Sequence, residues 1–224
     1  GIVWVCLSGH PRFDVPAFPE FDDAAFRTVL LTEPTMTRAN ALRMIIGTLD
    51  DTHFPWVHEG ILGSRDDCRP PEHGAVREGR YLEVHYEIEQ PPNLATTDVS
   101  AADGQEAVPI TYTNHVGMPN VIRLVKDSDS GRYVIWLASC AVAHDVTVNY
   151  WAFSRNYDMA PERDAVYREF SQAVRDQDKP IIESQRPVLV PPLDAGVALA
   201  MSPADRPLIE YIRWLDELGL TVYP

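Results

Sequence analysis

The clearest hydrophobic pattern in the chain is an alternation of apolar and polar residues over 81–88, the period of two expected of a half-buried strand. Further segments rich in β-branched and aromatic residues follow, separated by turn signals such as the Ser-Asp-Ser-Gly at 128–131; they are 109–115, 120–125, 133–143 and 146–153. Consecutive strands joined by short turns pair antiparallel, so this pattern predicts an antiparallel sheet in the middle of the chain.

Helical patterns flank these strands. Residues 37–51 are rich in helix formers and have a continuous apolar face, which predicts a helix that ends near Pro55. After the strands, residues 161–182 carry apolar positions at helical spacing. A proline-rich irregular return over 187–192 precedes a final amphipathic helix that starts at 202–205. The order of helix, sheet, helix and helix predicts an α+β fold.

The first 23 residues have a different character. Residues 1–7 are mostly apolar and read as the last strand of a preceding unit, while residues 10–23 contain three prolines among aromatic and acidic residues. We therefore expect residues 1–23 to be the end of another domain and a linker, and residues 24–224 to form the principal domain.

Composition and charge narrow the function classes. The 224 residues, 45% of them hydrophobic, can bury a substantial core. A formal charge of −14 disfavours binding to nucleic acid or to an anionic membrane surface. The longest uncharged apolar run, residues 133–143, is too short to cross a bilayer. Three cysteines, far apart in the sequence, argue against a disulfide framework and favour a cytoplasmic location.

Two histidines five positions apart are the main chemical signal. His53 and His58 form this pair, and Asp50 lies three residues before the first. The spacing alone is weak evidence, because hydrogen-bonded structural histidines would show it too. Residues five apart on an ideal helix point about 140° apart, so the two side chains share an ion only if the helix ends or distorts between them. Pro55 provides a reason for that distortion.

Two imidazoles and one carboxylate on one face of an ion form the facial triad of non-haem Fe(II) oxygenases, which leaves positions open for O₂. Many acidic residues are candidates for the carboxylate, and we favour Asp178 on the predicted helix over 161–182. Two alternatives remain: a metal-free protein that binds small molecules in a cavity, and a zinc hydrolase. The zinc hydrolase is disfavoured because no Glu follows His53 as in the His-Glu-x-x-His motif.

Two longer motifs resemble a known family. The first is His-Phe-Pro-x-Val-His-x-Gly-x-Leu-Gly, beginning at His53, with Asp three residues earlier; the second is Gln-Asp-x-x-Ile-x-Glu-x-Gln, beginning at Gln177. Together, on either side of a predicted antiparallel sheet, they resemble the catalytic domain of Rieske non-haem iron oxygenases. The resemblance is greatest to the vanillate O-demethylase and phenylpropionate-dioxygenase-like terminal oxygenases, and it covers most of the chain.

The resemblance implies a helix-grip fold of the START/Bet v 1 type, with a curved antiparallel sheet around a mononuclear iron. It implies that His53, His58 and Asp178 are the iron ligands. Asp50 would orient His53 and relay electrons from a cluster-ligating histidine of the neighbouring subunit in a homotrimer. The substrate cavity would be lined by Ile46, Phe54 and Gly47, the last at a position where the family usually has Asn.

The resemblance also implies partners. The family's [2Fe–2S] Rieske cluster is held by Cys-x-His and Cys-x-x-His pairs, which are absent from these 224 residues. We therefore expect a Rieske domain before Gly1, with residues 1–23 as its end and linker. Electrons from NAD(P)H would arrive through a flavin reductase, a ferredoxin or both. Fe(II) and O₂ would then hydroxylate or demethylate a small aromatic or related apolar compound.

Overall fold

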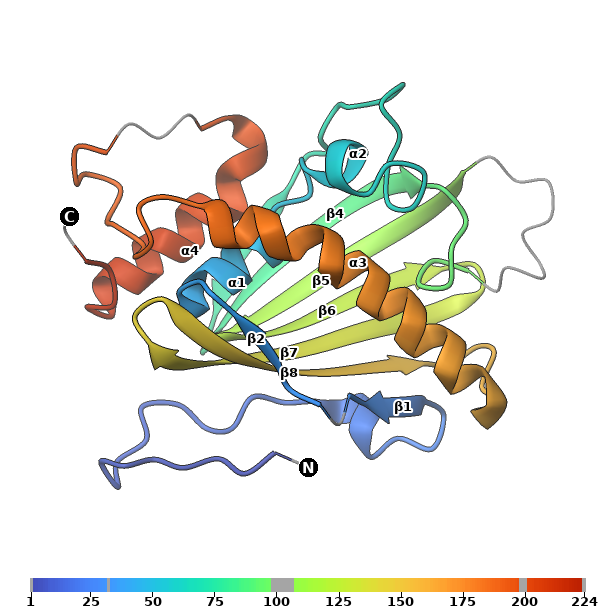
Figure 1. The fold of residues 1–224 in the computed structure, drawn as a ribbon, viewed down its shortest axis with the longest axis horizontal. Coiled ribbons are helices and arrows are strands. Elements are labelled where there is room, and N and C mark those ends of the chain that lie inside the picture. Colours follow the sequence, from blue (N-terminus) through green and yellow to red (C-terminus); the bar gives the residue numbers. More distant parts are fainter. Residues whose placement is uncertain (1, 32, 98–106, 198–200, 223–224) are drawn as a thin grey trace.

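An eight-stranded antiparallel sheet forms the centre of the protein in a computed structural model, which describes residues 2–31, 33–97, 107–197 and 201–222 (Figure 1). The strand order is β1-β8-β7-β6-β5-β4-β3, and β2 pairs with β8 as well. The strands are β1 (Arg27–Leu30), β2 (Thr35–Thr37), β3 (Gly74–Glu78), β4 (Tyr81–Gln90), β5 (Val108–Gly117), β6 (Val121–Ser128), β7 (Gly131–Ala143) and β8 (Val146–Arg155). With the helices beside it, this sheet confirms the predicted α+β class.

The five strands predicted from alternation and β-branched content are β4 to β8, and each is present. The pattern did not predict β1, β2 and β3, which are three to five residues long. Within this chain residues 2–6 form no strand and are mostly exposed, whereas Gly1 lies outside the described residues. That these residues belong to the last strand of a preceding unit stays a prediction.

The helices are α1 (Ala41–Leu49), α2 (Phe54–Val57), α3 (Asp164–Ser184) and α4 (Arg206–Glu217), with short 3₁₀ turns at Pro19–Phe21, Pro161–Arg163 and Pro203–Asp205. The first helix begins at Ala41 and not at residue 37, because the Asn40 side chain accepts a hydrogen bond from the Leu42 N–H and so caps the helix there. Pro55 lies in the first turn of α2 and does not end α1. Ser202 caps the last helical segment, as its sequence predicted.

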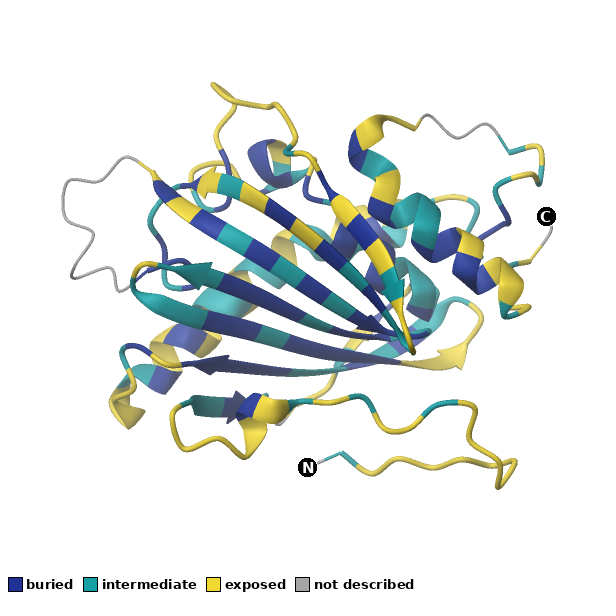
Figure 2. Ribbon diagram, turned by 180° about the vertical axis from the view of Figure 1, so that it is seen from behind, coloured by how far each residue is buried: buried dark blue, intermediate teal, exposed yellow. Residues whose placement is uncertain are grey.

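The helices cover one face of the sheet. In Figure 1, α3 crosses in front of the central strands, α1 lies beside it, and α4 lies at one end. Inward residues of β4 such as Leu82, Val84 and Tyr86 are buried against this layer. Seen from behind in Figure 2, β4 alternates between buried and more exposed residues. The N-terminal segment packs against this outer face of the sheet, where Phe18 stacks on Trp136 of β7 and the Ala17 N–H donates to the Tyr81 hydroxyl of β4. No helix in the described ranges is long and apolar enough to span a bilayer.

Candidate metal centre

The two histidines flank the single helical turn α2. His53 immediately precedes this turn and His58 immediately follows it. The helix predicted over 37–51 ends at Leu49, so the expected distortion between the histidines takes the form of a separate short helix. The two imidazole rings are 5.1 Å apart between centroids, and the His58 side chain is almost completely buried. The turn therefore brings both rings to one place.

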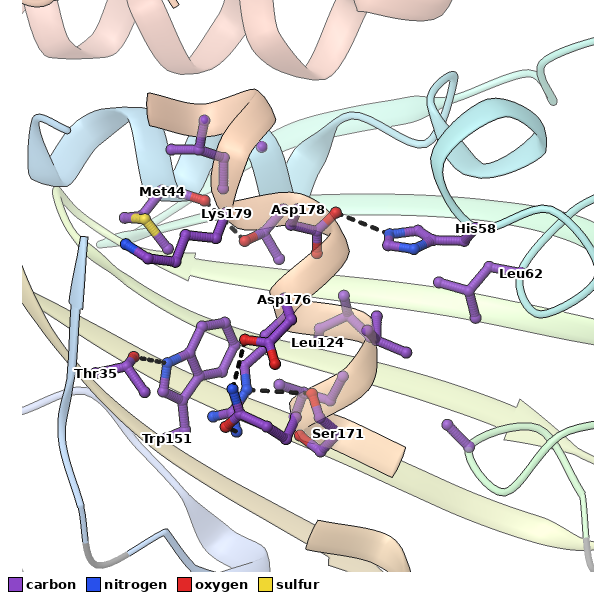
Figure 3. Close-up of a pocket in the computed structure, with 18 of the residues that line it drawn as sticks. Thr35, Met44, His58, Leu62, Leu124, Trp151, Ser171, Asp176, Asp178 and Lys179 are labelled. Atoms are coloured by element: carbon purple, nitrogen blue, oxygen red, sulfur yellow. Dashed lines mark hydrogen bonds and ion pairs between the residues drawn. The ribbon is translucent and has the colours of Figure 1, made fainter. Parts of the chain in front are cut away.

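Asp178 approaches both rings from α3. Its Oδ1 lies 2.8 Å from His58 Nε2 and 3.4 Å from His53 Nε2. Figure 3 shows Asp178 pointing from α3 toward His58, with strands of the sheet behind them. Within the described residues, these three side chains form a group whose potential ligand atoms all lie within 4.8 Å of one another. Asp178 thus meets two histidines that precede it by 120 and 125 positions in the sequence.

The opposite nitrogen of each ring contacts an oxygen. His58 Nδ1 lies 2.7 Å from Gln177 Oε1, and His53 Nδ1 lies 3.4 Å from Asp50 Oδ2. A carbonyl or carboxylate oxygen accepts hydrogen bonds, so each Nδ1 is placed to donate a proton to its oxygen, and this contact directs each Nε2 toward Asp178. Asp50 is itself held in place, because the Thr52 N–H and hydroxyl both donate to its Oδ1.

Two Nε2 lone pairs and a carboxylate oxygen at these distances would repel one another without a proton or another cation between them. Burial opposes a charge on His53, but hydrogen bonds to Asp178 and Asp50 outweigh burial and raise the pKa of His53 to about 9. Burial also acts to raise the pKa of Asp178, yet the hydrogen bonds from His53 and His58 lower it overall. The site therefore favours bound positive charge.

The donor set also fits a divalent transition metal. Imidazole nitrogens and a carboxylate oxygen are ligands for Fe(II), and two ligands at right angles about 2.1 Å from one ion lie about 3 Å apart. The distances of 2.8 and 3.4 Å from Asp178 Oδ1 to the two Nε2 atoms bracket that value. The contacts of Gln177 and Asp50 with the two Nδ1 atoms fix the orientation of the rings, as hydrogen-bond partners of metal-bound histidines do.

A close backbone contact supports the turn that carries the histidines. A Cβ on Gly63 would lie 2.8 Å from the Pro55 nitrogen and 3.0 Å from the Phe54 carbonyl carbon. The segment after His58 therefore packs directly on α2, and only a glycine fits at this position. This contact explains why the His-Phe-Pro motif continues to a glycine at residue 63.

The three residues open into an apolar cavity of about 360 Å³ between α3, α1 and the sheet. This volume is within the range of pockets that bind small molecules. Of the predicted substrate-contacting residues, Gly47 and Phe54 line the cavity, whereas Ile46 is buried in the core and does not. Trp151 lines the cavity from β8, with its Nε1–H donating to Thr35 Oγ1 (Figure 3).

Two residues of this region were not singled out from the sequence. Gln177 contacts His58 and lies next to Asp178 in the second motif, so its position in that motif was an available signal. Lys126 lines the cavity from β6, at an inward position that continues the apolar series of Ile122 and Leu124. A lone lysine on the buried face of an apolar strand was the signal for the second residue.

A family model described as the vanillate O-demethylase oxygenase C-terminal domain matches residues 37–220. The chain belongs to this family. The predicted resemblance to Rieske oxygenase catalytic domains is thereby confirmed. Other members of the Rieske oxygenases with similar sequences are named demethylases, and the similarity to them extends over nearly all of the chain.

Among these relatives, the methylxanthine N1-demethylase NdmA of Pseudomonas putida is 27% identical over 220 residues, which are 97% of this chain and 58% of NdmA. The probable methylxanthine N7-demethylase NdmC of Pseudomonas sp. strain TJI-51 is 29% identical, over 99% of this chain and 76% of NdmC. The chain thus spans little more than half the length of NdmA.

Solved structures agree on the fold of this family member. The structure of Pseudomonas putida CBB5 NdmA with caffeine has a TM-score of 0.75 and 28% identity, covering 92% of this chain and 55% of that one. Dicamba monooxygenase bound to 3,6-dichlorosalicylic acid has a TM-score of 0.72 at 18% identity, covering 91% of this chain and 62% of that one. The latter similarity supports the fold alone.

Proposed function

We propose that the protein is the catalytic domain of a Rieske-type terminal oxygenase that hydroxylates or demethylates a small aromatic or related apolar compound. The observation that carries this proposal is the convergence of His53 Nε2 and His58 Nε2 on Asp178 Oδ1 at the wall of an apolar cavity. Membership of the vanillate O-demethylase family and the names of the relatives support the same activity.

In this role His53, His58 and Asp178 would hold one Fe(II), which when bound supplies the chemistry of O₂ activation. Gln177 and Asp50 would each accept the Nδ1–H of one ligand histidine and so hold its Nε2 toward the ion. The cavity, lined by Phe54 and Gly47 near these ligands, would bind the organic substrate and exclude bulk water.

Asp50 would also relay electrons. Its side chain is 30% exposed while it contacts His53, so it connects this half-buried ligand to the protein surface. We propose that the electrons come from a [2Fe–2S] Rieske cluster of a neighbouring subunit in a homotrimer, supplied from NAD(P)H by a reductase, with or without a ferredoxin. In this view residues 1–23 are the end of the Rieske domain and its linker, residues 24–224 are the catalytic domain, and the enzyme works in the cytoplasm.

The overall reaction for a methyl ether balances with one O₂. The ether, O₂, NAD(P)H and one proton give the alcohol or phenol, formaldehyde, NAD(P)⁺ and water. Hydrogen peroxide is O₂ already reduced by the two electrons that NAD(P)H would supply, so the ether and H₂O₂ give the same organic products and water. Peroxide therefore permits a test of the catalytic domain without its electron donors.

The test is iron content together with the electron paramagnetic resonance spectrum of the nitric oxide adduct, followed by formaldehyde release from anisole-type ethers driven by peroxide. We expect one iron per chain in the wild type, loss of iron in His53→Ala, and retention in the control His144→Ala, whose side chain is exposed on a turn. Full iron retention in His53→Ala would exclude the proposed ligand set, and an iron-free wild type would favour a metal-free binding protein.

A further inference from the structure

Lys126 is a buried lysine without a counter-ion. It is 4% exposed, and its side chain lines the same cavity as the candidate metal ligands. Within the described residues, its side-chain nitrogen has no hydrogen-bond or ion-pair partner, and it lies over the Tyr112 ring, with Nζ 5.1 Å from the ring centroid. A buried charge is costly unless it is paired, and a lysine so placed calls for an explanation.

The neighbours of Lys126 form the floor of the cavity. Lys126 is directly opposite Tyr112 of β5 and Tyr133 of β7 in the sheet register, so all three side chains point to the same face. Both tyrosines line the cavity as well. Tyr112 cannot serve as a counter-ion, because burial raises its pKa far above neutrality and its hydroxyl donates to Gln90 Oε1. The lysine is thus framed by two neutral aromatic rings.

The other cations of the cavity wall differ because they already have partners. Arg175 donates to the Ser171 carbonyl and to Gln172 Oε1, and its guanidinium lies over the Trp151 ring, although its Nη1 has no hydrogen-bond partner. Lys179 donates to the Met36 carbonyl oxygen and to Glu183. Lys126 is therefore the cavity lysine whose three N–H donors remain available to a ligand.

We propose that Lys126 is a specificity-determining residue, which binds an anionic oxygen of the substrate, specifically a carboxylate, while the substrate ring lies between the sheet tyrosines and α3. This inference deepens the proposed function, because it selects aromatic acids among the small aromatic compounds. A carboxylate supplies the missing counter-ion and accepts the free N–H groups. Burial lowers the pKa of Lys126 to about 7, so an anion that binds there also stabilises the charged form of the lysine.

The test compares two ligands of nearly equal shape, 4-methoxybenzoate and 4-methoxybenzamide, by titration calorimetry on the 224-residue chain with and without iron. We expect the wild type to bind the acid about ten-fold more tightly than the amide, as one charge-assisted hydrogen bond implies. Lys126→Met should abolish this preference and Lys126→Arg should keep most of it. The control Lys179→Met should keep it as well, because the Lys179 ammonium is already paired.

Each alternative has a distinct result. Equal affinities of the wild type for acid and amide would overturn the proposal, and this comparison needs no variant to fold. A preference for the acid that survives in Lys126→Met would also overturn the proposal. If chelation of iron then removes the preference, the acid binds the metal. If the preference persists after chelation, another cation of the protein binds the acid. Iron content measured on the same samples separates this outcome from failure of the proposed function, because the preference is expected with or without iron.

Discussion

At the scale of single residues, α3 holds His58 from both sides. Asp178 faces its Nε2 and the adjacent Gln177 accepts from its Nδ1 at 2.7 Å. Loss of the Gln177 acceptor would leave a buried N–H unpaired and free the ring to rotate. Partners of this kind typically change metal affinity by 10- to 100-fold when removed.

We therefore expect Gln177→Leu to weaken Fe(II) binding by about 10- to 100-fold, whereas Gln177→Glu, which keeps an acceptor for the Nδ1–H, retains most of the affinity. Anaerobic titration with a competing chelator measures the Fe(II) affinity of both variants. The electron paramagnetic resonance spectrum of the nitric oxide adduct reports whether the coordination of the iron is unchanged. Equal losses in the two variants would show that residue 177 acts through packing and not as an acceptor.

At the scale of elements, the start of α3 is tied to the sheet by a buried ion pair. Asp164 accepts from Arg155 of β8 and from Arg27 of β1, with N–O distances of 3.0 and 2.6 Å. Arg155 is fully buried, so its guanidinium depends on Asp164 for a compensating charge. This pair fixes one end of the helix that carries Asp178 farther along.

Asp164→Asn should lower the free energy of unfolding by about 3 kcal/mol at pH 7, because it leaves the buried guanidinium of Arg155 without its carboxylate. The matched control, Asp127→Asn, removes the carboxylate of the more exposed Arg132–Asp127 pair and should cost at most about 1 kcal/mol. Urea denaturation of both variants measures these differences. Similar decreases in the free energy of unfolding for the two variants would mean that burial does not determine how much the Asp164 ion pair stabilises the protein.

The same carboxyl predicts a pH dependence. Burial acts to raise the pKa of Asp164, but the hydrogen bonds from Arg27 and Arg155 lower it below its ordinary value of about 3.9. The stabilisation is therefore complete above about pH 5 and is lost as the pH falls toward the folded-state pKa. Between pH 5 and 3 the wild type should lose more stability than Asp164→Asn, and parallel curves would contradict this assignment.

The elements also show what sequence patterns predict and what they miss. Alternation predicted β4 to β8 because each is long and has one strongly apolar face. The strands β1 and β2 were missed because three or four residues cannot show a period, and their pairing with β8 depends on contacts more than 100 residues away. Local capping by Asn40, not apolar spacing, determines where α1 begins.

For the site, local motifs and tertiary register contribute differently. The structure brings together His53, His58, Asp178 and Asp50, all of which were selected from motif spacing and resemblance. Gln177 was overlooked because its role depends on the rotation of α3 about its axis. Lys126 was overlooked because only the pairing of β6 with β5 and β7 shows that its side chain faces the cavity between two tyrosines.

At the scale of the whole molecule, the candidate metal centre joins parts of the fold that are far apart in the sequence. A bound ion would link the α2 turn to α3 across the cavity, on the side of the sheet covered by helices (Figure 1). Because an assembled ligand set exists only in the folded chain, the ion binds the native state preferentially and stabilises it by mass action.

At a free Fe(II) concentration 100 times the dissociation constant, the stabilisation is about 2.7 kcal/mol. For a chain of this size that corresponds to a rise of about 5–10 °C in Tm. Anaerobic thermal unfolding followed by circular dichroism should show this rise in the wild type and in His85→Ala, whose side chain is exposed on β4. It should be absent in His58→Ala and reversed by chelation. An equal rise in His58→Ala would place the bound iron elsewhere in the protein, because removal of the most buried ligand of the triad leaves only one imidazole and one carboxylate at this site.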